Sequence, residues 1–259
     1  ISAQNPFIRH YSTADGLPSN TVNWIEQDRD NFIWISTEGG LVRYDGSAFT
    51  NFGMKDGLSH NEVVNVKTDK QGRVWLFCLN GKRDFFYHNK IFNEKNTPFL
   101  KELRGTFYFV QDQYNNLYFF SFHARRISVL DSNNNLKHYF LPSVPQANNP
   151  VSRDGMNIQY LSRLPSNEFL IWTYNGLYKS NDLSKDPKLV VSFDRYHNIY
   201  PLGDTIMYDV IADKNTQSSL LIRYINGTPG DTTLFTEDAL DNDGLIVEDP
   251  NGYFWIGSY

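Results

Sequence analysis

Short apolar runs separated by polar turn residues follow one another along most of this chain. The runs are rich in Val, Ile, Phe, Tyr and Trp, which favour the half-buried surface of a β-strand. Asp, Asn, Gly and Ser stand between the runs, where short side chains and positive φ values make tight turns. The pattern therefore predicts many short antiparallel strands joined by tight turns.

One phrase of this pattern recurs, and its copies run from Trp24 to Ser36, from Val66 to Phe77 and from Ile246 to Gly257. In each copy an Asp precedes a Trp by six residues: Asp28 and Trp34, Asp69 and Trp75, and Asp249 and Trp255. We interpret each copy as a hairpin in which the Asp caps the turn and the Trp packs between repeats. These residues are therefore expected to be structural.

The copies are regularly spaced. Asp28 and Asp69 are 41 residues apart (69 minus 28), and Gly16-Leu17 returns at Gly57-Leu58 with the same offset. A third unit keeps the spacing with a Tyr in place of the Trp, at Asp112 and Tyr118. A fourth unit lacks the Asp, and a fifth is visible only as paired apolar runs over 206–213 and 220–224.

Four short strands in a repeat of about 40–45 residues are typical of a β-propeller blade. We therefore predict an all-β fold, a β-propeller built of four-stranded antiparallel blades, with about six blades visible and the last one incomplete. One array over residues 1–259 would hold blades at roughly 16–56, 57–100, 101–142, 155–195, 196–238 and 239–259. Because the last repeat stops after its second strand, the chain is expected to be a fragment of a longer protein.

Composition narrows the function classes. The net charge of −5 and the pI of about 5.7 provide no basic field, so no nucleic-acid partner is expected. No apolar run reaches the ~18 residues of a membrane span. The single cysteine, Cys78, follows an apolar run and is expected to be a buried, inert thiol. The start, Ile1 to Gln4, is similar to the edge of a removed signal peptide.

Motifs that carry chemistry are sparse, so no catalytic residue, metal or cofactor is predicted. The six histidines show no metal-ligand spacing, and there is no Gly-x-Ser-x-Gly sequence. The stretch Asp241 to Gly244 lacks the first and last acidic ligands of a calcium loop, so we interpret it as a polar loop. Asn226-Gly227-Thr228 fits the glycosylation acceptor pattern, but an ordinary turn is the plainer interpretation.

Residues 16–46 resemble the two-component regulator propeller repeat. The resemblance is carried by Gly16-Leu17-Pro18-Ser19-Asn20, by Asp28, by Phe32 to Thr37 and by Gly40 to Gly46. Residues 57–76 and 246–257 also match well, whereas about 105–240 match only in period and turn placement. The chain departs from the family pattern at Asn31 and Ser36, and Phe77-Cys78-Leu79 replaces the family's Gly-Thr.

The resemblance implies a place in the extracytoplasmic sensor region of a bacterial sensor histidine kinase, including the hybrid two-component systems of Bacteroidetes. In that family the propeller precedes a β-sandwich, a membrane span and the kinase, and some members detect glycan fragments. The chain would then be a periplasmic, non-catalytic ligand-sensing domain of a histidine kinase. Its partners would be an oligosaccharide or small polar ligand and the rest of the same sensor, with a homodimer left open.

The loops that enter the inner strands are expected to share one face with the loops after the second strands. The candidate ligand-binding residues on that face are Ser19, Asn20, Glu38, His60, Asn61 and Asn80. Turn structure is the alternative role of each of them. Two other functions stay open at this point: a propeller enzyme acting on polysaccharide, as a lyase or glycosidase, and a non-catalytic interaction scaffold. Converging ionisable groups would favour the enzyme.

Overall fold

The structure is a computed structural model of the chain. It describes residues 9–106, 108–121, 125–141, 158–173, 176–193, 198–202, 206–213, 218–236, 245–248 and 254–257. The chain divides into two compact units, Ile1–Phe107 and Tyr108–Tyr259, which are described separately below. Among the residues so described, no helix has the length and apolar character needed to cross a membrane.

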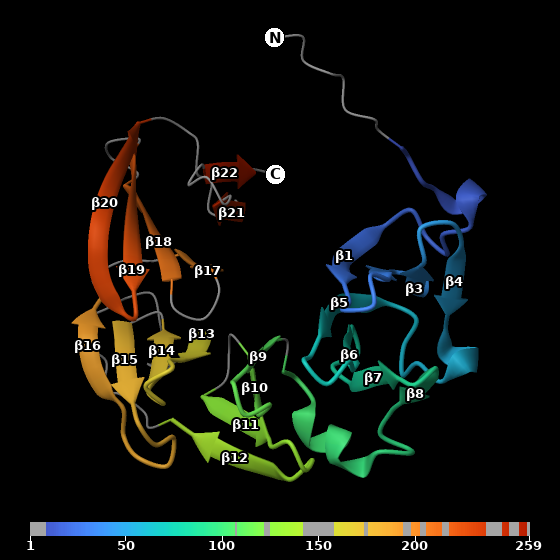
Figure 1. Cartoon of the computed structure of the whole chain (residues 1–259), viewed down its shortest axis with the longest axis horizontal. Helices are drawn as coiled ribbons and strands as arrows, with labels where there is room; N and C mark the ends of the chain where they lie inside the picture. Colours follow the sequence, from blue (N-terminus) through green and yellow to red (C-terminus); the bar gives the residue numbers. More distant parts are fainter. Residues whose placement is uncertain are drawn as a thin grey trace. The chain divides into compact units, whose positions relative to one another are not determined.

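The first unit holds two four-stranded antiparallel sheets whose strands are paired in chain order (Figure 1). Blade 1 consists of β1 (Val22–Gln27), β2 (Ile33–Thr37), β3 (Gly40–Tyr44) and β4 (Phe49–Phe52). Blade 2 consists of β5 (Val63–Thr68), β6 (Val74–Cys78), β7 (Arg83–Tyr87) and β8 (Lys90–Phe92). The short 3-10 helices η1 (Thr13–Asp15) and η2 (Met54–Asp56) precede the blades, and η3 (Pro98–Leu103) follows them.

The second unit continues the same architecture with three more four-stranded sheets. Blade 3 consists of β9 (Tyr108–Gln111), β10 (Leu117–Phe120), β11 (Arg126–Leu130) and β12 (Leu136–Phe140). Blade 4 consists of β13 (Ile158–Arg163), β14 (Phe169–Thr173), β15 (Gly176–Ser180) and β16 (Lys188–Ser192). Blade 5 consists of β17 (Asn198–Leu202), β18 (Ile206–Asp213), β19 (Ser218–Ile225) and β20 (Thr228–Thr236). A two-stranded sheet follows, β21 (Leu245–Glu248) and β22 (Phe254–Gly257).

These sheets confirm the predicted fold class, an all-β propeller of four-stranded antiparallel blades. Strand β17 was not anticipated, because Pro201 within it weakens the strand pattern of the sequence. Two expectations remain predictions: that the chain forms one array, and that it is a fragment of a longer protein. The Asp241 to Gly244 stretch lies outside the described residues.

Packing between successive blades forms the core of each unit. In the first unit, Trp34 and Leu41 of blade 1 share a buried cluster with Val63 and Val66 of β5. In the second unit, Tyr118 and Ile127 of blade 3 share the equivalent cluster with Ile158 and Leu161 of β13. A four-stranded sheet has two apolar faces, so each blade needs a neighbour on either side to remove both from water.

Candidate functional site

The Asp of the repeat binds both its own turn and the aromatic residue six positions later. Oδ1 of Asp28 accepts hydrogen bonds from the backbone N–H groups of Asp30 (2.9 Å) and Phe32 (3.0 Å). Oδ2 accepts a 2.6 Å hydrogen bond from Nε1 of Trp34. The spacing of six residues therefore places a carboxylate within reach of an indole on the adjacent strand.

Asp69 makes the same contacts in blade 2 and adds an ion pair. Its Oδ1 accepts from the backbone N–H groups of Gln71 (2.9 Å) and Arg73 (3.0 Å), and its Oδ2 from Nε1 of Trp75 (2.8 Å). Nε of Arg73 lies 2.6 Å from the same Oδ2, and both side chains of the pair are buried. Both oxygens of this carboxylate are thus used by the fold.

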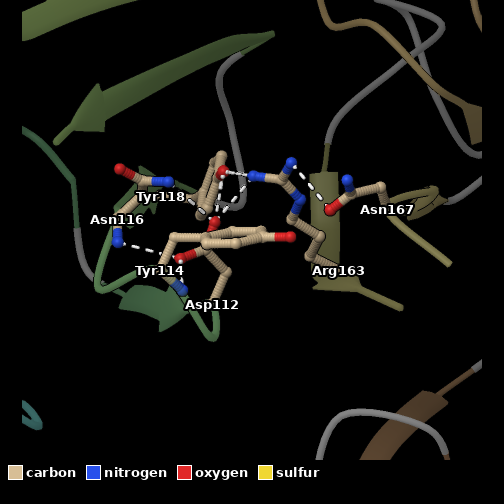
Figure 2. Close-up of polar contacts among 6 residues, drawn as sticks. All are labelled: Asp112, Tyr114, Asn116, Tyr118, Arg163 and Asn167. Carbon is tan, nitrogen blue, oxygen red and sulfur yellow. Dashed lines mark hydrogen bonds and ion pairs between the residues drawn. The ribbon is translucent and has the colours of Figure 1, made fainter. Parts of the chain in front are cut away.

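The third copy, shown in Figure 2, gathers ionisable groups from two blades. Oδ1 of Asp112 accepts from the backbone N–H groups of Tyr114 (2.8 Å) and Asn116 (2.9 Å). Its Oδ2 accepts from Nδ2 of Asn116 (2.8 Å), from the hydroxyl of Tyr118 (2.9 Å) and from Nη1 of Arg163 (2.6 Å). Burial alone would raise the pKa of Asp112, but the hydrogen bonds from Asn116, Tyr118 and Tyr114 hold it below its ordinary value.

Arg163 joins the turns of blades 3 and 4. It ends β13, and its Nη1 also contacts the hydroxyl of Tyr118 while its Nη2 donates to Oδ1 of Asn167 (3.1 Å). The ring of Tyr114 lies 5.7 Å from the guanidinium carbon, so the cation is held between an aromatic face and a carboxylate (Figure 2). The side chain of Asp112 is only 2% exposed. The cluster of Asp112, Tyr118 and Arg163 is therefore better suited to holding blades 3 and 4 together than to catalysis.

The predicted loop-face residues occur as equivalent pairs in blades 1 and 2. Oδ1 of Asn20 accepts from the backbone N–H of Thr13 (2.8 Å), and Oδ1 of Asn61 accepts from that of Met54 (3.0 Å). Oγ of Ser19 accepts from the backbone N–H of Thr21 (3.0 Å). Nδ1 of His60 accepts in the same way from Glu62 (3.0 Å). Each of these four side chains therefore has a local role in the turn that leads into its inner strand.

The other two candidates come from the turns after the second strands. The backbone N–H of Glu38 donates to the carbonyl of Thr21 (3.4 Å), and its side chain is exposed. Nδ2 of Asn80 donates to the carbonyl of Ser59 (3.0 Å). These hydrogen bonds place the two kinds of loop side by side within the first unit, at one end of blades 1 and 2.

A cavity of about 410 Å³ opens at this end of blade 1. It is lined by Pro18, Gly39, Asn51, Phe52, Gly53, Met54, Lys55 and Asn61. Asn61 is the one predicted candidate in the lining. The other lining residues were not anticipated, because nothing in the sequence pattern indicated that β4 and η2 would leave space between them. A Cβ on Gly39 would lie 2.6 Å from the carbonyl oxygen of Pro18, so glycine permits this close approach of two loops.

Beside these loops, blade 2 buries a charge that the sequence reasoning missed. Asp84 pairs with Leu76 and so takes the register position that Val42 holds in blade 1. It accepts from the backbone N–H (2.7 Å) and hydroxyl (2.6 Å) of Ser59, and Sγ of Cys78 lies 3.7 Å away. Burial raises the pKa of Asp84 and that of the Cys78 thiol. The two adjacent charged residues that begin this otherwise aromatic strand, Arg83 and Asp84, were the available signal.

The remaining predicted residues are only partly described. Asp249 lies outside the described residues, and Trp255 is described by the backbone of β22 alone. Asn226 and Gly227 have φ values of 52° and 76° and form the turn between β19 and β20, as expected. Within the described part of the chain, no group of three or more His, Cys, Asp or Glu side chains could hold a metal ion.

Comparison with known proteins finds one family model that is similar to part of the first repeat. Residues 16–39 match the family model described as two component regulator propeller. Among curated proteins, no sequence matches the chain.

Two solved structures with TM-scores of 0.61 and 0.60 show the fold. A streptogramin B lyase structure has a TM-score of 0.61 at 12% identity, covering 93% of this chain and 77% of that chain. Virginiamycin B lyase from Staphylococcus aureus has a TM-score of 0.60 at 12% identity, covering 91% and 77%. The extracellular domain of a putative hybrid two component system from B. thetaiotaomicron has a TM-score of 0.46 at 14% identity, covering 86% and 34%.

Proposed function

We propose that this chain is the periplasmic ligand-sensing propeller domain of a two-component sensor histidine kinase, and that it carries out no catalysis itself. The observation that carries the proposal is the match of residues 16–39 to the two component regulator propeller repeat. Ligand binding here would bias the conformation of the parent protein and so change the activity of its kinase. In the full-length protein, histidine autophosphorylation measured with and without ligand tests this link.

The ligand would be a glycan-derived or other small polar molecule, bound in the cavity at the end of blade 1. The volume of about 410 Å³ falls within the ~300–1,000 Å³ of small-molecule sites. Pro18, Phe52 and Met54 offer an apolar surface for the C–H face of a sugar ring. Lys55 adds a cation, which would favour a ligand with an acidic group.

Two amides can fix the orientation of such a ligand. Asn51 uses its Nδ2 to bind the carbonyl of Gly16 (2.8 Å), which leaves its Oδ1 to accept from a ligand hydroxyl. Asn61 uses its Oδ1 to bind the backbone of Met54, which leaves its Nδ2 to donate. The cavity therefore combines an apolar wall with one acceptor, one donor and one positive charge.

The composition of the lining favours binding over glycoside cleavage. A glycosidase of the usual type needs two carboxyl groups about 5–10 Å apart across the scissile bond. The eight lining residues include no Asp or Glu. A binding site for a neutral or acidic saccharide is consistent with this lining.

Calorimetry with a panel of neutral and acidic oligosaccharides tests the proposal. We expect saturable binding without product formation, and affinity lowered roughly tenfold by Lys55→Gln or Met54→Ala. Lys95→Gln is the matched control, because Lys95 is also exposed, lies in the turn after β8 and does not line the cavity. Product release detected by chromatography would contradict a non-catalytic domain. Binding unchanged in both cavity variants would contradict the site.

A further inference from the structure

The connection between the third and fourth strands of blade 4 is the longest of its kind in the five four-stranded blades (Figure 1). Seven residues, 181–187, join β15 to β16, whereas two residues, 88 and 89, join β7 to β8, and five, 131–135, join β11 to β12. A cavity of about 300 Å³ opens beside this connection, within the second unit. Because long connections often carry binding residues, this cavity is a candidate for a second ligand.

Local contacts hold this loop in shape. Oγ of Ser180 accepts from the backbone N–H of Asp182 (3.1 Å) and donates to its carbonyl (2.7 Å). Oδ1 of Asp182 accepts from the backbone N–H (2.9 Å) and the hydroxyl (2.7 Å) of Ser184. Leu183 is buried in one cluster with Tyr118 of blade 3. The loop is therefore anchored by polar turns and by an apolar side chain, so the charged residues around it are carried by an ordered backbone.

The lining of this cavity carries both signs of charge. It includes three lysines and three carboxylates: Lys179, Lys185, Lys188, Glu168, Asp182 and Asp186. Nζ of Lys185 lies 3.8 Å from Oδ2 of Asp182. Among the residues that the structure describes, no other ion pair involves any of these six side chains. Two ammonium groups and two carboxylates of the lining are therefore left without an ionic partner.

Two of these cations, Lys179 and Lys188, occupy directly opposed positions on β15 and β16. Side chains at such positions lie on the same face of the sheet, where like charges repel each other. The pairs nearest the corresponding loop in blades 1, 2 and 3 are Tyr44 with Phe49, Tyr87 with Lys90, and Leu130 with Leu136. None of those three pairs brings two cations together. A carboxylate bound between Lys179 and Lys188 would relieve the repulsion that is particular to blade 4.

We propose that the cavity at the β15–β16 loop binds a free amino acid in its zwitterionic form. The carboxylate of the ligand lies between Lys179 and Lys188, and its ammonium group is bound by Glu168 and Asp186. A neutral ligand would leave these four charges unpaired, and a simple anion would leave the two carboxylates unpaired, so a ligand with both charges is the complementary one. The volume of about 300 Å³ is at the lower end of the range for small-molecule sites, which suits a single amino acid.

Calorimetric titration of the full protein with L-glutamine tests the need for both charges, because the side chain of glutamine adds no charge of its own. N-acetyl-L-glutamine lacks the ammonium group, and L-glutaminamide lacks the carboxylate. We expect saturable binding of glutamine with a Kd of about 1 mM or lower, and at least about tenfold weaker binding of both analogues. The absence of saturable binding up to about 10 mM glutamine would overturn the proposal. Equal affinity for either analogue would also overturn it, because one charge would then be sufficient.

Lys188→Gln tests the location of the site, and Lys90→Gln is its matched control. Both lysines are exposed and begin the fourth strand of their blade, but Lys90 lies opposite Tyr87 and does not line this cavity. Lys188→Gln should lower the affinity for glutamine roughly tenfold, and Lys90→Gln by less than about twofold. Bound glutamine stabilises the folded state, so it should raise Tm less in Lys188→Gln than in Lys90→Gln. Equal affinities or equal rises in Tm for the two variants would overturn the proposal.

Discussion

The indole Nε1 of Trp34 lies 2.6 Å from Oδ2 of Asp28, and the other oxygen of that carboxylate holds the turn between their two strands. Trp34 in turn packs in the cluster that joins blade 1 to blade 2. One carboxylate therefore links a local turn to an interface between blades. The conspicuous residues of the repeat are engaged in building the fold, which directs the search for ligand contacts to the loops.

Replacing Asp69 by Asn should destabilise blade 2. An amide can accept on one oxygen, but its NH₂ group would then face Nε1 of Trp75 or Nε of Arg73, both donors. Leaving buried donors unpaired costs about 1–3 kcal/mol each, so we expect the free energy of unfolding to fall by roughly 2–4 kcal/mol. Urea unfolding followed by tryptophan fluorescence measures the change.

Asp131→Asn is the matched control for that substitution. Asp131 binds the backbone N–H groups of Asn133 (2.9 Å) and Asn135 (2.8 Å) as Asp69 binds its turn, but at an exposed turn where no aromatic donor is bound. Asn forms the same kind of turn, so a loss below about 1 kcal/mol is expected. Equal losses at the two positions would show that the turn alone, without the aromatic donor, accounts for the role of Asp69.

Local features of this chain could be predicted from the sequence because both partners lie in the same hairpin. The Asp28 and Trp34 contact spans six residues, and the repeat of their spacing indicated both the turn and the blade. The caps at Asn20 and Asn61 are likewise local to their loops. Strand alternation and turn chemistry act over such short distances, so the sequence pattern contains them.

Contacts between distant segments could not be predicted in this way. Arg163 binds Asp112 from 51 residues away, and Ser59 binds Asp84 from 25 residues away. The position of Arg163 is occupied in other blades by the uncharged residues Gln27, Thr68 and Gln111. The sequence therefore shows that Arg163 is unusual at this position, but it does not show which residue Arg163 binds. The cavity at the end of blade 1 depends in the same way on how β4, η2 and two loops pack together.

Arg163→Met should weaken the second unit and alter its acid sensitivity. The substitution keeps much of the side-chain volume but removes the cation that lies 2.6 Å from the buried carboxylate of Asp112. Removing one partner of a buried pair typically costs about 3–5 kcal/mol. Because Asn116 and Tyr118 still bind Asp112, we expect the lower part of that range.

The pH dependence of the same variant has a definite sign. The pKa of Asp112 is depressed in the folded state, so its contribution to stability is present above the unfolded value near 3.8 and is lost as pH falls through the folded value. The guanidinium of Arg163 lies 2.6 Å from Oδ2 of Asp112 and favours the ionised carboxylate, so its removal should raise this pKa and the acid loss should begin at higher pH. Urea unfolding of both proteins between about pH 3 and pH 7 measures this. Parallel curves would contradict a role of the pair in acid stability.

Asp84→Asn should change pH dependence in the opposite direction. Burial raises the folded-state pKa of Asp84, so ionisation costs stability as pH rises from the ordinary value of 3.8 through the folded value. Asn keeps an acceptor for Ser59 but cannot ionise. The variant should therefore become more stable relative to the wild type as pH increases across that window, as measured by urea unfolding.

Asp45→Asn provides the contrasting control. The backbone N–H of Ala48, with further hydrogen bonds from Ser47, lowers the pKa of this exposed carboxyl to about 2. Its contribution is present above the ordinary value of 3.8 and is lost as pH falls towards about 2. The wild type should become more stable relative to this variant as pH rises through that range. The same slope for Asp84→Asn and Asp45→Asn would contradict the assignment of Asp84 as a buried charge.

Gly39→Ala should disturb the two loops that line the cavity. The effect should exceed the conformational cost that a Gly→Ala substitution has by itself. The added Cβ would lie 2.6 Å from the carbonyl oxygen and 2.9 Å from the carbonyl carbon of Pro18, so one of the two loops must shift. Gly46→Ala is the control: Gly46 has a φ of 96°, and nothing lies within 4 Å of the added Cβ. That control measures conformational strain alone, about 1 kcal/mol.

We expect Gly39→Ala to cost at least about 2 kcal/mol, because the contact is with backbone atoms that cannot rotate away. It should also weaken ligand binding, since Pro18 and Gly39 both line the cavity. Thermal unfolding and calorimetry of the two variants separate these effects. If Gly39→Ala matched Gly46→Ala in Tm and kept full affinity, the close approach of the two loops would have no part in shaping the cavity.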